Sequence, residues 1–264
     1  MLNIVQAVLV LSVMGLVFGG VLAYASRVFA VEVDERIPLI IEVLPGANCG
    51  GCGFAGCNAF ADAIVNGIAK TGGCPVGGNA TAGKVAEIMG VASEHLDRYG
   101  ARIICGGNNE NAMKKYRYSG INDCLSAMRL GSGDKACTYG CIGLGSCVKK
   151  CPLGAISIVD GIAVVSPEKC IGCGLCVPNC PKKVISLVPY DKKVNTACRS
   201  CDKGAASRQY CNVSCIGCKI CEKNCPDEAI KVKDNLAVID YEKCTDCGIC
   251  VEKCPRKCIT MGCS

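Results

Sequence analysis

The pattern of hydrophobic residues changes along the chain. At the N-terminal end of the chain, this pattern predicts a membrane helix. The residues from Ile4 to Ala25 form one apolar run without a charged side chain, in which Gln6 is the one strongly polar residue. A helix of this length spans about 33 Å, which is enough to cross the hydrocarbon core of a bilayer. The pattern therefore predicts an N-terminal transmembrane helix.

A cleaved signal peptide is the alternative for this run, because Ala23 to Ala25 resembles a cleavage site. No Lys or Arg precedes the run, whereas Arg27 and Arg36 follow it. Basic residues next to a membrane segment favour the cytoplasmic side. We therefore expect a single-pass anchor in the cell membrane, with the remainder of the chain on the cytoplasmic side.

Farther along, the hydrophobic residues recur first at helical and then at strand spacing. The segment 58–70 predicts one helix, and the segment 84–100 predicts a second helix that ends at Gly100. The segments 155–165 and 229–239 are short and rich in Ile and Val, which predicts a pair of strands in each. The spacing thus indicates an α+β protein.

Composition shows that hydrophobic packing alone does not hold this chain together. Among 264 residues there are 27 Cys but only 4 Phe and no Trp. A cysteine content of this size indicates either disulfides or metal sites. The odd number of cysteines does not suit a closed disulfide framework, so their spacing decides between the two.

Three cysteine runs have the spacing C-x2-C-x2-C-x3-C-P, and they begin at Cys170, Cys215 and Cys244. This pattern is typical of [4Fe-4S] ligation in bacterial ferredoxins, where the fourth cysteine binds the neighbouring cluster. Structural zinc prefers isolated cysteine pairs, and disulfides within such short runs would be strained. The runs therefore predict [4Fe-4S] clusters.

The runs belong to an internal repeat with an offset of 74 residues. Cys151 and Cys180 fall on Cys225 and Cys254 under this shift, and the two strand segments also coincide. The repeat predicts two modules that each hold two clusters. The crossed ligation rule assigns three ligand sets: Cys170, Cys173, Cys176 with Cys151; Cys215, Cys218, Cys221 with Cys254; and Cys244, Cys247, Cys250 with Cys225.

The run from Cys137 to Pro152 is irregular, because Leu144 stands where the other runs have their middle cysteine. Cys137 is available four residues before Cys141. We therefore expect the following ligand set for this cluster: Cys137, Cys141, Cys147 and Cys180. A lost cluster or a three-iron cluster is the alternative.

A glycine-rich segment near the apolar run supplies four more cysteines with the spacing C-x2-C-x4-C-x16-C. The glycines allow tight turns and a close approach of backbone amides to inorganic sulfide. We expect a fifth [4Fe-4S] cluster, with zinc as the alternative. Its expected ligands are Cys49, Cys52, Cys57 and Cys74.

The remaining cysteines leave room for a sixth cluster. The 74-residue shift maps Cys124 onto Cys198 and Cys137 onto Cys211. A sixth cluster would use Cys198, Cys201 and Cys211, with Cys105 or Cys124 as the fourth ligand; buried free thiols are the alternative. Cys258 and Cys263 are expected to stay unligated.

Together these features predict four domains: an anchor helix (1–30), a small helical four-cysteine domain (31–100) and two tandem two-cluster ferredoxin-like modules (101–195 and 196–264). The formal charge is +6. A [4Fe-4S]2+ core with four thiolates carries about −2, so several clusters bring the whole protein close to neutrality or make it mildly acidic.

The order of anchor, C-x2-C-x4-C-x16-C motif and ferredoxin runs resembles the Rnf-complex B subunits over essentially the whole chain. The resemblance implies an iron–sulfur subunit of an ion-translocating ferredoxin:NAD+ oxidoreductase. It implies reduced ferredoxin as electron donor and other subunits of a membrane complex as partners, with no nucleic acid. A membrane-tethered polyferredoxin that serves another oxidoreductase, such as a hydrogenase, is the alternative.

The sequence also indicates which roles belong to partner subunits. It contains neither a P-loop nor a dinucleotide-binding fingerprint, and its one histidine, His95, lies in a predicted helix. No catalytic residue is therefore expected. Basic residues beside the ligand runs form a hypothetical docking surface for an acidic ferredoxin: Lys149, Lys150, Lys182, Lys183, Lys219, Lys223, Lys253, Arg256 and Lys257.

Overall fold

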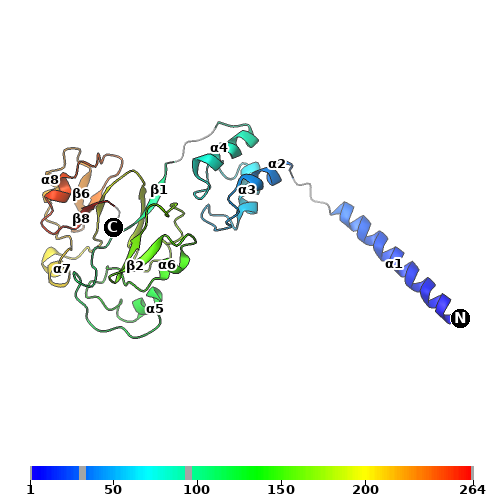
Figure 1. Ribbon diagram of the computed structural model, residues 1–264, viewed down its shortest axis with the longest axis horizontal. Coiled ribbons are helices and arrows are strands. Elements are labelled where there is room, and N and C mark those ends of the chain that lie inside the picture. Colours follow the sequence, from blue (N-terminus) through cyan, green and yellow to red (C-terminus); the bar gives the residue numbers. More distant parts are fainter. Residues whose placement is uncertain (1, 30–33, 93–96, 263–264) are drawn as a thin grey trace.

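The computed structural model describes residues 2–29, 34–92 and 97–262. In Figure 1 a long N-terminal helix is followed by a small helical domain and then by a larger part that contains the strands. His95 and Cys263 lie outside the described residues.

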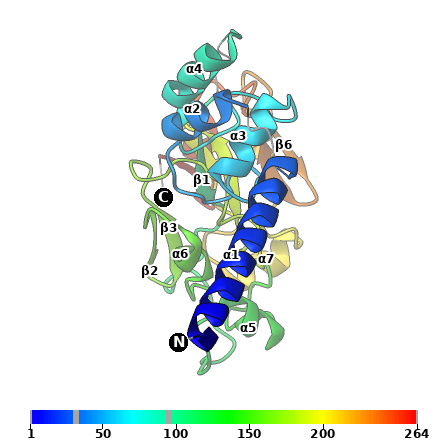
Figure 2. The ribbon, with the colours of Figure 1, turned by 90° about the vertical axis from the view of Figure 1, so that its right-hand side faces the viewer.

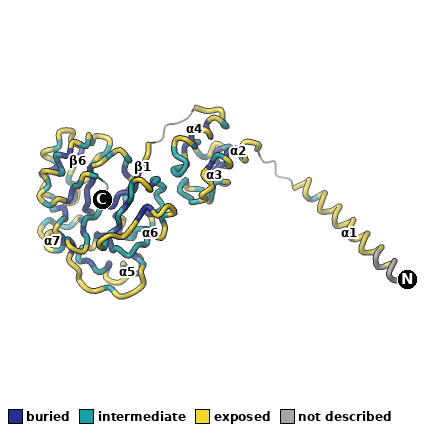
Figure 3. Tube along the Cα trace, in the orientation of Figure 1, coloured by how far each residue is buried: buried dark blue, intermediate teal, exposed yellow. Residues whose placement is uncertain are grey.

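The first helix, α1 (Leu2–Val28), confirms the predicted N-terminal apolar helix. Its segment Leu9–Val28 is long and apolar enough to cross a membrane, judged by length and composition. The side chains of this segment are not covered by the rest of the protein, and Leu16, for example, is 77% exposed (Figure 3). No protein core therefore accounts for its apolar surface.

The small helical domain contains α2 (Arg36–Val43), α3 (Cys57–Val65) and α4 (Gly78–Met89), which lie together in Figure 2. Burial of their apolar faces holds the three helices together. The buried core consists of Ile40, Leu44, Phe60, Ala61, Ile64 and Val85.

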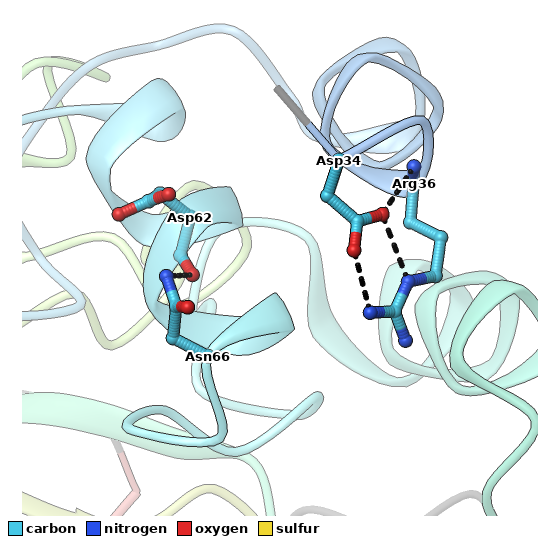
Figure 4. Close-up of polar contacts among 4 residues, drawn as sticks. All are labelled: Asp34, Arg36, Asp62 and Asn66. Atoms are coloured by element: carbon cyan, nitrogen blue, oxygen red, sulfur yellow. Dashed lines mark hydrogen bonds and ion pairs between the residues drawn. The ribbon is translucent and has the colours of Figure 1, made fainter. Parts of the chain in front are cut away.

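Short polar contacts fix the helix ends of this domain (Figure 4). Asp34 Oδ2 lies 2.7 Å from Arg36 Nη2, and Asp34 Oδ1 accepts hydrogen bonds from the Arg36 Nε and backbone amide, both at 2.9 Å. These hydrogen bonds lower the pKa of Asp34 to about 2. At the end of α3, the Asn66 side chain donates to the Asp62 carbonyl at 2.9 Å.

The helix predicted over 58–70 is present as α3, but the prediction of a second helix up to Gly100 is wrong. Helix α4 ends at Met89, because Gly90 adopts a left-handed conformation with φ of 67°. The amide of Val91 then donates to the Ala86 carbonyl at 3.0 Å, which is the pattern of a Schellman cap. Gly100 lies in a strand instead.

The larger part consists of two modules, each with two antiparallel strand pairs. The pairs of strands predicted over 155–165 and 229–239 are confirmed. The strand pairs of the first module are β1 (Tyr99–Ile103) with β4 (Ile185–Pro189) and β2 (Ile156–Val159) with β3 (Ile162–Val165). Those of the second are β5 (Val194–Thr196) with β8 (Ile259–Met261) and β6 (Ile230–Lys233) with β7 (Leu236–Ile239).

Short helices complete the modules. They are α5 (Cys124–Arg129), α6 (Ser146–Lys150), α7 (Gly204–Tyr210), α8 (Ile220–Lys223) and α9 (Ile249–Glu252). Three of them (α6, α8 and α9) lie within a cysteine ligand run.

Strand register shows that the internal repeat has two offsets. Strands β2 and β3 precede β6 and β7 by 74 residues. Ile103 pairs with Ile185, however, and Thr196 pairs with Ile259, so β1 precedes β5 by 93 residues. The first module therefore carries 19 extra residues between β1 and its first ligand run, and α5 lies in this insertion.

Candidate metal centres

Cysteines from both ligand runs of the first module meet at one cavity, which we call site 2. Backbone amides point at two of the sulfurs: Ala155 N donates to Cys151 Sγ at 3.3 Å, and Ala101 N donates to Cys170 Sγ at 3.4 Å. Such amide hydrogen bonds stabilise a bound thiolate. The cysteines that line site 2 are Cys151, Cys170, Cys173 and Cys176, the set that crossed ligation predicts.

The second module brings together two more of the predicted sets. Burial raises the pKa of Cys250 to about 11, and the charges of its three neighbouring cysteines contribute. Ala229 N donates to Cys225 Sγ at 3.3 Å, which repeats the contact of Ala155 with Cys151. We call the two groups site 5 (Cys215, Cys218, Cys221 and Cys254) and site 6 (Cys225, Cys244, Cys247 and Cys250).

The irregular run differs from its prediction, because Cys137 lines another cavity and Cys124 takes its place. The cavity that we call site 3 is lined by Cys124, Cys141, Cys147 and Cys180. Burial raises the pKa of Cys147 to about 12, and the charges of the other three cysteines contribute. The helix α5, which the first module has as an insertion, thus supplies a cysteine where Leu144 replaces one.

Ser146 fixes the position of Cys124 beside Cys147. The Cys124 amide donates to Ser146 Oγ at 2.7 Å, and Ser146 Oγ donates to Asp123 Oδ1 at 2.8 Å. Asp123 is the N-cap of α5 and also accepts from the Ser126 amide at 2.8 Å. Leu144 packs in the small apolar cluster around Cys124, so it fills space next to the cysteine that replaces it.

Site 1 is the four-cysteine group of the small helical domain, Cys49, Cys52, Cys57 and Cys74. Amides of its glycine-rich loops point at sulfur: Gly51 N donates to Cys49 Sγ at 3.5 Å and Gly77 N to Cys74 Sγ at 3.4 Å. Burial raises the pKa of Cys74, and the charges of Cys52 and Cys57 raise it further.

Site 1 lies against site 2. A Cβ atom at Gly51 would stand 3.3 Å from both the Cβ and the carbonyl oxygen of Cys173. Burial raises the pKa of Cys173, and among the contributing charges is that of Cys49 from site 1. A glycine at position 51 therefore lets the ligand loop of one site touch a ligand of the next.

The sixth cluster predicted from Cys198, Cys201 and Cys211 is only partly supported by the geometry. A further cavity between the modules is lined by Cys105, Cys137, Cys198 and Cys211. Cys201 does not line it and is exposed. Cys124 lines site 3 instead. The 74-residue mapping of Cys124 onto Cys198 is also wrong, because strand register relates the two modules here by 93 residues and makes Cys105 the counterpart of Cys198.

Cys258, which was expected to be unligated, lines the same cavity as the four cysteines of site 5. Its sulfur lies 3.6 Å from Cys254 Sγ. Hydrogen bonds from Cys258 lower the pKa of both Cys215 and Cys254. The corresponding residue of the first module is Val184, so among the described residues the lining of the equivalent site 3 has no such fifth thiol.

The donor chemistry of these sites fits iron–sulfur clusters. Within the described part of the chain, no group of three or more His, Cys, Asp or Glu side chains converges closely enough to hold a single metal ion. Thiolates around a cubane stand farther apart than thiolates around one ion, because four irons and four sulfides lie between them. Thiol donors with amides directed at sulfur are the environment that [4Fe-4S] clusters take.

The cysteine sites and the paired strands together define an iron–sulfur protein with tandem ferredoxin-like modules. Comparison with protein families leads to the same class. Residues 44–76 match a family described as "Putative Fe-S cluster". Residues 163–186 match "4Fe-4S binding domain", and residues 214–259 match "4Fe-4S dicluster domain". The chain is therefore a [4Fe-4S]-binding protein.

Comparison with individual proteins narrows this class to one family. Three similar proteins are described below, and each is the B subunit of an ion-translocating oxidoreductase complex. The chain is 48% identical over 262 residues to that of the Na(+)-translocating ferredoxin:NAD(+) oxidoreductase complex of Acetobacterium woodii, a match that covers 98% of this chain and 79% of the relative. It is 46% identical to that of the proton-translocating ferredoxin:NAD(+) oxidoreductase complex of Clostridium ljungdahlii, over 92% of this chain and 86% of the relative. For the ion-translocating oxidoreductase complex of Methanosarcina acetivorans the identity is 43%, over 92% of both chains.

The chain belongs to the family of Rnf-complex B subunits, as its resemblance implied. It is an iron–sulfur electron-transfer subunit of this oxidoreductase family.

Proposed function

We propose that this chain accepts electrons from reduced ferredoxin at its second module, which holds sites 5 and 6. It then relays them through sites 3 and 2 to site 1, and from there to membrane subunits of an ion-translocating complex. A bound [4Fe-4S] cluster supplies reversible one-electron transfer. The chain itself supplies the thiolates, the amide hydrogen bonds to sulfur and the close approach of successive sites. In this proposal site 3 is held by Cys124 with Cys141, Cys147 and Cys180.

One observation carries the direction of transfer. Cys173 and Cys247 are equivalent under the 74-residue repeat. Cys173 is partly covered, because the glycine-rich loop of site 1 packs on it at Gly51. Cys247 is exposed. The face that receives another cluster domain in the first module is therefore free in the second module, where a separate ferredoxin can approach in the same way.

Exposed lysines beside the second module suit an acidic donor. Cys218 of site 5 is exposed, and Lys219 and Lys223 next to it are exposed as well. Two residues of the hypothetical docking surface do not belong to it: Lys182 is buried and donates to the Thr138 carbonyl, and Arg256 donates to the Cys211 carbonyl at 2.8 Å. Because the proposed donor approaches the second module, where Cys218 and Cys247 are exposed, we restrict the docking surface to the exposed lysines of that module.

The apolar helix α1 supports the location that we propose. It would anchor the chain by a single pass, and Arg27 in its last turn favours a cytoplasmic position for the domains that follow. Site 1 follows the anchor in the chain and is the proposed exit toward the membrane subunits.

Ferredoxin-dependent reduction of the purified full chain, measured against ionic strength, tests the proposal. We expect the rate constant to fall as salt rises, and we expect a Lys219→Glu/Lys223→Glu variant to react about tenfold more slowly at low salt. Lys84→Glu, a substitution on α4 in the small helical domain, is the matched control and should leave the rate unchanged. A rate that does not respond to salt or to the double variant contradicts the docking surface.

A further inference from the structure

We infer that Cys105, Cys137, Cys198 and Cys211 form a [4Fe-4S] site, site 4, between the two modules, and that it joins site 3 to site 5. The existence of the site rests on the geometry alone. Its role in electron flow rests also on the proposed function.

The cavity at site 4 has the size of the cavities at sites 2, 3 and 5. Its empty volume is about 380 Å³, against about 350 Å³ at site 3, 320 Å³ at site 5 and 370 Å³ at site 2. Gly107 faces the cavity: a Cβ atom there would lie 3.5 Å from Cys211 Sγ and 3.7 Å from Cys105 Sγ. The space between the sulfurs is thus bordered by a residue without a side chain.

The internal repeat supplies the four cysteines as two equivalent pairs. Cys137 and Cys211 are related by the 74-residue offset, and each stands four residues before the first ligand of a run. Cys105 and Cys198 are related by the 93-residue offset, and each follows the strand that opens its module. Each module therefore contributes the same two positions to one shared site, which an accidental group of buried thiols would not do.

Thiols from both modules line this one cavity, with Cys105 and Cys137 from the first module and Cys198 and Cys211 from the second. The Cβ position of Gly107 lies within 4 Å of one sulfur from each module, those of Cys105 and Cys211. Thiols from both modules thus border the same space.

A buried lysine borders the cavity of site 4, and an arginine from the lining of site 5 contacts one of its cysteines. Lys135 is only 4% exposed, and its Nζ donates to the carbonyls of Gly107 at 2.7 Å and Gly161 at 2.8 Å. Arg256 donates to the Cys211 carbonyl, while its buried Nε has no hydrogen-bond partner. Buried cations are costly without a nearby anion. When four thiols lose their protons and bond to [4Fe-4S]2+, the product carries about −2, which provides that anion.

Backbone hydrogen bonds connect site 4 to its two neighbours in equivalent ways. The amide of Cys141, a residue of site 3, donates to Cys105 Sγ at 3.3 Å. The amide of Cys215, a residue of site 5, donates to Cys198 Sγ at 3.3 Å. Each connection joins a sulfur of site 4 to the backbone of a ligand in the next site. Site 4 thereby completes a continuous series from site 1 to site 6.

Iron analysis of the anaerobically purified full chain tests the inference. We expect about 24 irons per chain, and about four fewer in a Cys105→Ser/Cys211→Ser variant, which removes one ligand from each module. Cys201→Ser is the matched control, because Cys201 lies close in sequence but is exposed and outside the cavity. It should keep the full iron content.

Anomalous scattering at the iron edge from crystals of the wild-type chain keeps the inference testable if the double variant does not fold. Density for iron among the four named sulfurs supports the site. The inference is overturned by an empty cavity, by a double variant with unchanged iron, or by iron loss in Cys201→Ser alone. None of these results depends on whether ferredoxin is the donor, so a failure here is distinct from a failure of the proposed function.

Discussion

Gly172 lies in the ligand loop of site 2, and its replacement by alanine tests how tightly this loop is held against β1. The residue has φ of +69°, and a Cβ atom would stand 2.3 Å from the carbonyl oxygen of Tyr99. Tyr99 is part of β1 and pairs with Pro189, so this oxygen belongs to a fixed backbone. Relief of the overlap to 3.0 Å needs a shift of about 0.7 Å.

Gly154→Ala provides the matched control, because Gly154 has φ of +59° and nothing within 4 Å of its Cβ position. The left-handed conformation costs about 1–2 kcal/mol in both variants. The overlap adds about 1–3 kcal/mol in Gly172→Ala alone. In the second module, the residue equivalent to Gly172 is Asp246, which also has a left-handed backbone with φ of 58°. Its carboxylate accepts hydrogen bonds from Lys193 N and Val194 N.

Cluster loss in denaturant, followed by visible absorbance under anaerobic conditions, measures the difference. An extra 1–3 kcal/mol corresponds to cluster loss that is about 5- to 160-fold faster in Gly172→Ala than in Gly154→Ala. Equal rates for the two variants would refute the close contact between the loop and β1.

Two further predictions concern single cysteines. Cys124→Ser should remove about four irons per chain or convert site 3 to a three-iron cluster with its own EPR signal, because α5 then no longer supplies the fourth thiolate; unchanged iron and EPR would mean that Cys124 is not a ligand. Cys258→Val introduces the residue type that the first module has at the equivalent position, Val184. This variant should keep all iron but lower the reduction potential of site 5, because a hydrogen bond to the ligand sulfurs is lost. An unchanged potential in an EPR redox titration would show that Cys258 does not tune site 5.

The regular ligand runs and the strand pairs between them are predictable from sequence, because both depend on local spacing. The C-x2-C-x2-C-x3-C-P pattern places Cys170, Cys173 and Cys176 within one loop, and the repeat shows where the fourth cysteine returns. Strands β2 and β3 follow from a short segment rich in Ile and Val. These parts of the fold require no knowledge of distant contacts.

The contacts that the sequence did not reveal depend on distant segments. The 19-residue insertion changes the offset of the repeat, so a single shift of 74 pairs Cys124 with Cys198 although Cys105 is the true counterpart. The gap of 36 residues between Cys105 and Cys141, against 17 between Cys198 and Cys215, is the sequence signal that would have shown the insertion. Lys182 looks like a surface lysine in sequence, but its burial depends on the fold around site 3.

Anaerobic titration of the full chain with reduced ferredoxin tests electron transfer along the series of sites most directly. We predict that the iron–sulfur absorbance bleaches with uptake of about one electron per site, and that the EPR signal of site 1 appears although ferredoxin docks at the second module. If dithionite reduces site 1 but ferredoxin reduces no site at low salt, the chain does not carry electrons from ferredoxin along this series, and the proposed function is wrong.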